Sequence, residues 1–237
     1  MNRPGQATFD PVEFELGGGV SCFGEYAMAG TPSSSLCVVL HDEGEDLVSL
    51  RWLSLLLLAE GISQLMLDLP GHGLSDGTMA DHLEATLDAA QAFARSIGCA
   101  TVGLVAKGST CRSMLVTAQP CPPVGAVLVS PAGQIGDSVQ HVSWQQVPKL
   151  AFLQADKPAT AAFADAVVRD THAWCLRASL AFDPATGPVP AVAQTQIGSI
   201  AAKFLLEQIA FAQAAQAAMQ PRGHQRIPAA SERPVQP

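Results

Sequence analysis

Short apolar runs alternate along this chain with longer stretches of helical periodicity. The runs that have the length and the β-branched content of buried strands are Leu36–Leu40, Ile62–Leu67, Thr101–Val105 and Val124–Val129. The helical stretches that separate them are Leu47–Glu60, Thr78–Ile97 and Ser109–Thr117. Strands that are apolar on both sides need cover on both faces, and a parallel sheet flanked by helices provides it. The pattern therefore predicts an α/β fold with a mostly parallel sheet and helices on both faces.

The two ends of the chain extend this pattern. Val12–Leu16 and Val20–Ala27 flank a run of glycines at 17–19, which predicts an N-terminal antiparallel hairpin. The later predicted elements are strands at Pro148–Leu153 and Trp174–Leu180, a helical stretch around Thr160–Arg169, and a terminal helix at Val189–Met219. We expect a single domain over residues 1–220 and a disordered tail over 221–237, which is rich in proline, arginine and small polar residues.

Composition excludes several classes of function. Hydrophobic residues make up 48% of the 237 residues and charged residues 14%, which supplies a large core. The net charge of -8, with scattered lysine and arginine, argues against a nucleic-acid-binding face. The longest apolar run, Leu53–Ala59, is far shorter than the roughly 20 residues of a membrane span. Without a secretory leader or any metal-ligand spacing among the six cysteines, we expect a cytoplasmic chain with reduced thiols and no cofactor.

Two neighbouring motifs carry a resemblance to a known family. They are VVLHDEG at Val38–Gly44 and LMLDLPGHGLSD at Leu65–Asp76. Together they resemble the segments that follow the third and fourth strands in single-domain members of the α/β-hydrolase superfamily. The resemblance covers roughly residues 12–208 in the order of elements, and its motifs are strong from 38 to 77. It implies an α/β-hydrolase-like fold, and the short interval 131–147 implies that no cap domain is present.

The resemblance also implies a nucleophile elbow of the form G-x-S-x-G, where a strand turns sharply into a helix. The aligned segment here reads Ala106-Lys107-Gly108-Ser109-Thr110, so Gly108 stands at the position of the nucleophile. Ser109 is a weak candidate nucleophile one residue later. The alternative is that Ser109 caps the following helix, a role that serine favours.

The other catalytic positions of the family are altered too. The family histidine follows the last strand, but loop 181–190 has none; His172 precedes that strand and His224 lies in the tail. Asp156 either matches the family acid or is a surface-loop residue. The family's His-Gly near the oxyanion reads His41-Asp42, and a carboxylate there would oppose developing negative charge. The resemblance thus implies the fold of a hydrolase without its catalytic residues.

Parallel strands bring their carboxyl ends to one edge of the sheet, where ligands bind in such folds. The residues expected at a pocket there are His41, Asp42, Asp68, Lys107, Gly108, Ser109 and Cys111. Cys111 begins a helix, where a thiolate can be stabilised. Lys107 is expected to bind an anion or to pair with Asp42 or Asp68. The polar run at 41–46 has the composition of either an oxygen-rich metal site or an acidic solvated loop, and we favour the loop.

Three hypotheses of function follow. The favoured one is a catalytically inactive accessory or binding subunit for a protein partner or a paralogue. The second is a non-triad hydrolase or lyase that uses His41, Asp42, Lys107 and Ser109, or Cys111. The third is a small-molecule binding module with an apolar cavity near Gly108.

Overall fold

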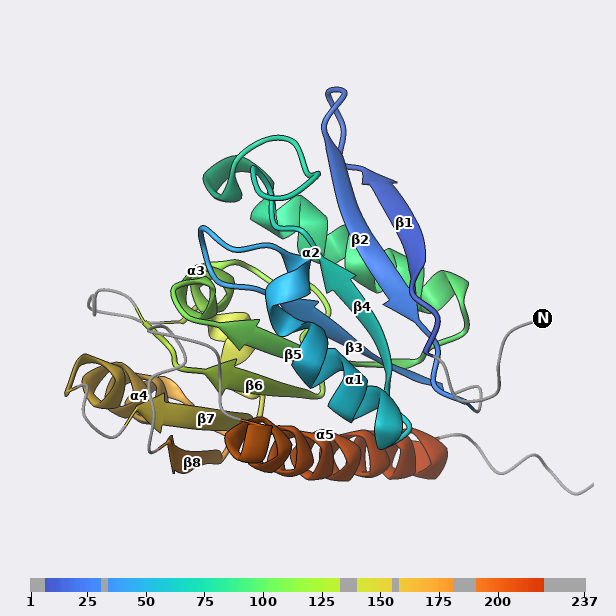
Figure 1. The fold of residues 1–237 in the computed structure, drawn as a ribbon. Helices are drawn as coiled ribbons and strands as arrows, with labels where there is room; N and C mark the ends of the chain where they lie inside the picture. Colours follow the sequence, from blue (N-terminus) through green and yellow to red (C-terminus); the bar gives the residue numbers. More distant parts are fainter. Residues whose placement is uncertain (1–6, 31–33, 133–139, 155–157, 181–190, 220–237) are drawn as a thin grey trace, which may run out of the picture.

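The computed structural model describes residues 7–30, 34–132, 140–154, 158–180 and 191–219. In them a single eight-stranded sheet has the order β1-β2-β4-β3-β5-β6-β7-β8 (Figure 1). The strands are β1 Asp10–Glu15, β2 Ser21–Ala27, β3 Ser35–Leu40, β4 Ser63–Leu67, β5 Thr101–Lys107, β6 Gly125–Val129, β7 Lys149–Gln154 and β8 Cys175–Leu180. The pairs β1–β2 and β2–β4 are antiparallel, and all other pairs are parallel. The prediction of a mostly parallel sheet with an N-terminal hairpin is confirmed.

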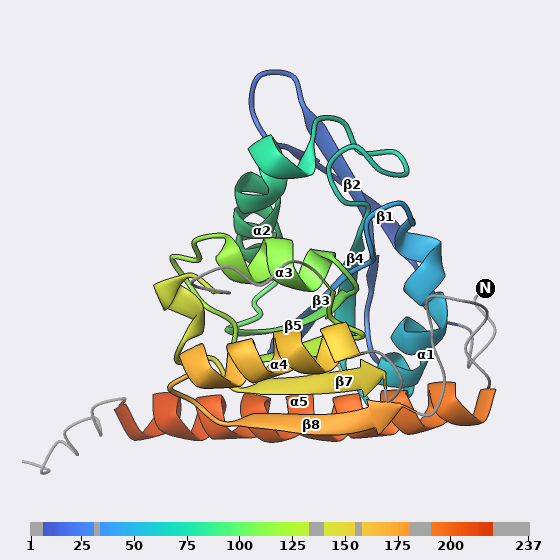
Figure 2. The same cartoon turned by 90° about the vertical axis from the view of Figure 1, so that its left-hand side faces the viewer.

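Helices cover both faces of this sheet (Figure 2). The helices are α1 Arg51–Ala59, α2 Met79–Ser96, α3 Thr110–Val116, α4 Pro158–Asp170 and α5 Ala191–Met219, with short 3-10 turns η1 Leu47–Leu50 and η2 Val142–Trp144. α1 and α5 pack together on one face, and α2, α3 and α4 lie on the other. The strand residues alternate between the two layers: Val38 and Leu104 face α2 and α3, whereas Val39 and Val105 face α1 and α5.

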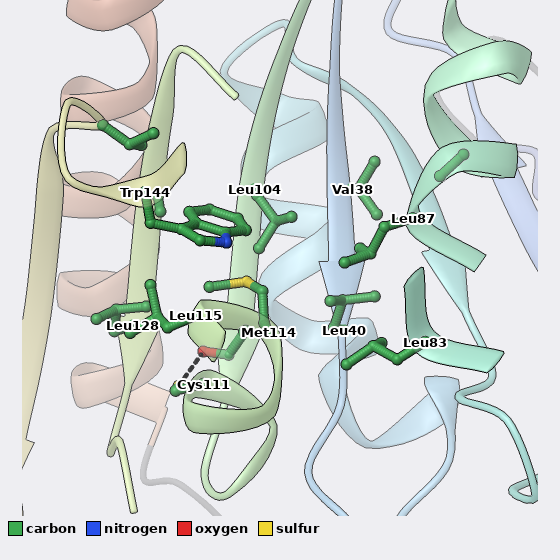
Figure 3. Close-up of a cluster of buried hydrophobic side chains, with 14 of the residues drawn as sticks. Val38, Leu40, Leu83, Leu87, Leu104, Cys111, Met114, Leu115, Leu128 and Trp144 are labelled. Atoms are coloured by element: carbon green, nitrogen blue, oxygen red, sulfur yellow. Dashed lines mark hydrogen bonds between the residues drawn. The ribbon is translucent and has the colours of Figure 1, made fainter. Parts of the chain in front are cut away.

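A buried tryptophan packs in the hydrophobic cluster between α3 and the sheet. Trp144 lies against Met114, Leu115 and Leu128 there (Figure 3). Its indole N–H donates to the Thr117 carbonyl at 2.8 Å, so the one polar atom of the ring is satisfied. This contact joins η2 to the end of α3 and thereby helps to hold α3 on β5 and β6.

The opposite layer depends on close contact between α5 and the sheet. A Cβ added to Gly125 in β6 would lie 2.8 Å from Gln208 Cγ, and one added to Gly103 in β5 would lie 3.0 Å from Leu205 Cδ2. α5 therefore packs almost directly on strand backbone, which only glycine permits. In the described part of the chain neither α5 nor any other helix is apolar over enough residues to cross a membrane.

The β2–β4 pairing positions the loop that follows β4. Gly24 lies opposite Leu67, and the Asp68 amide donates to the Phe23 carbonyl at 2.9 Å. The first residue after β4 is thus fixed by β2, and the LPGHG segment starts from a fixed point. The contact at Gly24 is tight because an added Cβ would lie 2.5 Å from the Met66 carbonyl oxygen.

We predict that Gly24→Ala lowers the free energy of unfolding by about 2 kcal/mol, because the methyl group meets strand backbone that has no room to move. Gly30→Ala is the matched control, since its Cβ would meet no described atom within 4 Å. That substitution should change stability by less than about 1 kcal/mol. Urea unfolding of both variants measures the difference, and equal stabilities would contradict the prediction.

Candidate functional site

The turn between β5 and α3 has a glycine at its apex. Gly108 has a φ of 59°, in the left-handed region that favours glycine. Its amide donates to the Val129 carbonyl and its carbonyl accepts the Ala132 amide, both at 2.9 Å, so the segment after β6 holds the turn from one side. This apex is the position that the sequence alignment assigns to the nucleophile.

The Asp42 carboxylate covers the apex from the other side. A Cβ on Gly108 would overlap this carboxylate. Asp42 Oδ1 accepts the backbone N–H of Ser109 and also its hydroxyl, both at 2.8 Å. It accepts the Glu43 amide at 2.8 Å as well. The carboxylate is therefore well supplied with donors and occupies the space above Gly108.

Ser109 stands at the N-terminal cap of α3 without acting as a side-chain cap. Its hydroxyl makes no capping hydrogen bond to the helix and points instead to Asp42, with the Glu43 carboxylate 3.3 Å away. The alternative that Ser109 caps the helix with its side chain is therefore wrong. The hydroxyl hydrogen goes to the Asp42 carboxylate, a charged acceptor that binds more strongly than a neutral one, and this bond directs the side chain toward Asp42.

A second carboxylate fastens the same loop. The Lys107 ammonium group is largely buried and pairs with Glu45, not with Asp42 or Asp68 as expected. Glu45 also accepts the Ser49 hydroxyl at 2.8 Å and the Asp42 amide at 3.3 Å. Partial burial raises the pKa of Glu45, but the bonds from Lys107 and Ser49 outweigh it and the pKa is lowered overall. The loop between β3 and η1 is thus held on the elbow by two carboxylates.

Asp68 supports backbone. Its Oδ1 accepts the Leu47 amide and its Oδ2 accepts the Leu74 amide, each at 2.9 Å. Gly73 has a φ of 54° and leaves no room for a Cβ beside this carboxylate. Asp68 therefore joins the end of β4 to the start of η1.

His41 is held in one neutral form. Its Nε2 accepts the Leu69 amide at 3.0 Å, so Nδ1 carries the hydrogen and donates to the Asp42 carbonyl at 2.7 Å. Desolvation lowers the pKa of His41, and the backbone bond to Asp42 and the charge of Asp68 only partly oppose this. Both ring nitrogens are committed to backbone, which leaves none for proton transfer to a ligand.

Cys111 points into the core. Its thiol donates to the Ala106 carbonyl at 3.2 Å, among Met114, Leu115 and Leu128 (Figure 3). Burial, assisted by the charge of Asp42, raises the pKa of Cys111 far above the ordinary value for a thiol. The expectation of a stabilised thiolate is therefore wrong, because the side chain faces away from the helix N-terminus and from solvent.

The structure thus brings together Asp42, Gly108 and Ser109, with the Lys107–Glu45 pair beside them. His41, Asp68 and Cys111 have structural partners instead. Asp156, loop 181–190, His224 and the tail 221–237 lie outside the described residues. His172 accompanies the start of β8, at the opposite edge of the sheet, where its amide donates to the Gln145 carbonyl. Among the residues that the structure describes, no three His, Cys, Asp or Glu side chains are grouped to hold a metal ion.

Glu45 is the residue whose role the sequence did not indicate. It appeared only as one acidic residue of the 41–46 loop. The register Leu40↔Ala106 in the parallel β3–β5 pair could have indicated the pairing of Glu45 with Lys107. It places the loop after β3 beside Lys107, where a carboxylate would find the buried ammonium group.

The chain was compared with known protein families, sequences and structures. No family model and no curated protein sequence matches the chain. Solved structures do match. A dienelactone hydrolase from Anabaena variabilis has a TM-score of 0.67 at 14% identity, over 85% of this chain and 98% of that one. Est1E from Butyrivibrio proteoclasticus with bound ferulic acid has 0.65 at 13%, over 84% and 99%. Thermogutta terrifontis esterase 2, phosphoramylated by tabun, has 0.64 at 14%, over 87% and 96%. The chain has the α/β-hydrolase fold, and likeness at such identities shows no more than the fold.

The neutral state of His41 predicts a specific loss of stability in acid. Because the folded pKa is lowered, the unfolded chain binds more protons than the folded one near and below pH 6.5. The stability contribution is therefore complete above that pH and is lost as the pH falls through it. Urea unfolding at pH 7.5 and 5.5 should show a smaller loss in His41→Gln than in the wild type. His172→Gln, at an exposed position, should keep the wild-type loss; an unchanged loss in His41→Gln would contradict the assignment.

The overlap at the elbow predicts energetic coupling between positions 108 and 42. Gly108→Ala should destabilise the protein by about 2 kcal/mol or more, through the left-handed backbone and the clash with Asp42. In an Asp42→Gly background the clash is absent, so the same substitution should cost at least about 1 kcal/mol less. A double-mutant cycle by urea unfolding measures the coupling. Additive effects would show that the carboxylate does not occupy this space in solution.

Proposed function

We propose that this protein is a non-catalytic member of the α/β-hydrolase fold class that acts as a binding or accessory subunit for a protein partner. The observation that carries the proposal is the Asp42 carboxylate, which lies over Gly108 and accepts the Ser109 amide. In the fold class, the amide that follows the nucleophile is one of the two donors of the oxyanion hole. Here an internal negative charge uses that donor.

Two losses combine at this elbow. Glycine supplies no attacking oxygen at the apex, and removal of a triad nucleophile costs about 10⁶-fold in well-studied cases. The donor occupied by Asp42 represents a further loss of about 10²–10³-fold, before the repulsion between the carboxylate and a developing oxyanion is counted. Neither His41, with both nitrogens bonded to backbone, nor the buried Cys111 compensates for these losses.

The second candidate is a non-triad enzyme, and one contact favours it. Asp42 Oδ1 lies 2.8 Å from the Ser109 hydroxyl, as a base would lie beside a nucleophile. A carboxylate is a weak base for a serine hydroxyl, since their pKa values differ by many units. The same oxygen also holds the Ser109 amide, so the pair lacks a free oxyanion donor. This pairing supports the non-catalytic role better than nucleophilic attack.

An apolar ligand beside Gly108 finds less support than a protein partner. The space over the glycine is bordered by the Asp42 carboxylate, and Glu43 next to it is exposed. An apolar group seated there would desolvate a charge without replacing its hydration. A polar or basic partner surface suits the edge better.

We predict that a fluorophosphonate probe does not label the wild-type protein and that p-nitrophenyl esters are not turned over above the buffer rate. An active serine esterase in the same assay serves as the positive control. Ser109→Ala is the matched variant and should behave as the wild type does. Stoichiometric labelling that maps to Ser109 and disappears in Ser109→Ala would overturn the proposal and favour the second candidate.

A further inference from the structure

The outer face of α5 carries a distinctive set of exposed side chains. Ile200, Leu206 and Phe211 are large apolar residues with exposed fractions of 45%, 39% and 75%. Lys203 and Glu207 are the only charged residues of the helix and are also exposed. Neither of them forms an ion pair within the described part of the chain. The face thus combines uncovered apolar side chains with two unpaired opposite charges.

These residues are arranged symmetrically along the helix. Ile200 and Phe211 lie on either side of a midpoint between positions 205 and 206, and Lys203 and Glu207 lie on either side of a midpoint at position 205. The two pairs therefore share nearly the same centre, next to Leu206. At about 100° per residue, Ile200, Glu207 and Phe211 fall on one side of the exposed stripe and Leu206 on the other. A two-fold axis perpendicular to the helix and beside Leu206 relates two antiparallel copies of α5. The side of the stripe with Ile200 and Phe211 in one copy then lies next to the same side in the other copy. This arrangement therefore brings Ile200 onto Phe211 and Lys203 onto Glu207 of the partner subunit.

Two hollows flank the stripe, each at a position where the symmetric arrangement would place an apolar side chain of the partner subunit. A groove of about 470 Å³ lies beside Phe211 and is also bordered by Trp174 and Pro148. A second hollow of about 390 Å³ lies on the Leu206 side, between Glu60 and Ala210. In the symmetric arrangement Ile200 of the partner subunit enters the first and Leu206 of the partner subunit enters the second.

We propose that two copies of this chain associate through antiparallel α5 helices, with Leu206 beside the two-fold axis. The partner that fits this face is a second copy of the chain, because the face is complementary to itself when it is reversed. Each Lys203 then meets a Glu207 of the other copy, and each Glu207 meets a Lys203. The buried side of α5 fixes the rotation of the helix, since Gly103 and Gly125 admit it so closely. The inference is independent of the non-catalytic role, because it concerns a face of the sheet and not the elbow.

The test is a charge exchange in the full-length protein, read by light scattering after size-exclusion chromatography. The wild type should be a dimer at micromolar concentration. Lys203→Glu and Glu207→Lys each place like charges at both contacts and should weaken the dimer about tenfold or more. An equimolar mixture of these two variants should recover a dimer, since every 203–207 contact in the mixed pair joins opposite charges. The double variant Lys203→Glu/Glu207→Lys should dimerise as the wild type does.

Phe211→Ser tests the apolar contact, with Val142→Ser, an exposed valine on η2, as its matched control. The first should weaken the dimer and the second should not. Circular dichroism checks that each variant is folded. We expect folding to be unaffected because the substituted side chains are exposed. A wild type that stays monomeric at hundreds of micromolar would overturn the proposal. So would single charge variants that dimerise as tightly as the wild type, or a mixture that remains monomeric while the wild type dimerises.

Discussion

The hydrogen bonds from the Ser109 amide and hydroxyl to the Asp42 carboxylate are the contacts on which the structure of the elbow depends. They require glycine at 108, because any Cβ there would enter the space of the carboxylate. They also require the loop after β3 to approach the elbow closely. The two requirements support each other: the small residue admits the carboxylate, and the carboxylate satisfies an amide that would otherwise face solvent or a ligand. Restoration of a side chain at position 108 would therefore have to be accompanied by loss of the carboxylate at position 42.

The neighbouring groups make this arrangement stable. Lys107 offsets part of the negative charge through Glu45, and Glu45 in turn accepts the Asp42 amide. His41 stays neutral and joins the end of β3 to the start of the β4 loop through the Leu69 amide. Lys107, Glu45 and His41 thus have partners inside the protein, whereas the buried hydroxyls of Thr110 and Ser130 beside the elbow have none among the described residues. Asp42 and Glu45 thereby hold the loop on the elbow, and the Glu43 side chain beside them is exposed.

The architecture could be predicted from sequence because it depends on period and length. Continuous apolar runs such as Leu36–Leu40 need cover on both faces, and that need alone selects a helix-flanked parallel sheet. The site was less predictable because it depends on side-chain direction over one or two ångströms. Cys111 was placed correctly at the start of α3, but the helical phase that turns its thiol to the Ala106 carbonyl was not inferred. The partner of Lys107 was missed because the path of the loop after β3, not its composition, selects Glu45 over Asp42 and Asp68.

The elbow and the outer face of α5 are separate surfaces, and their positions make the two proposals compatible. The elbow lies at the carboxyl ends of the strands. The groove beside Phe211 is bordered by Pro148 and Trp174, which precede β7 and β8 and so lie at the amino ends. A dimer formed through α5 therefore covers the face and the far edge of the sheet and leaves the edge around Asp42 and Glu43 open. Two copies would then present two such edges, and a partner with two matching sites would gain from an intramolecular second contact without any new interaction at either edge.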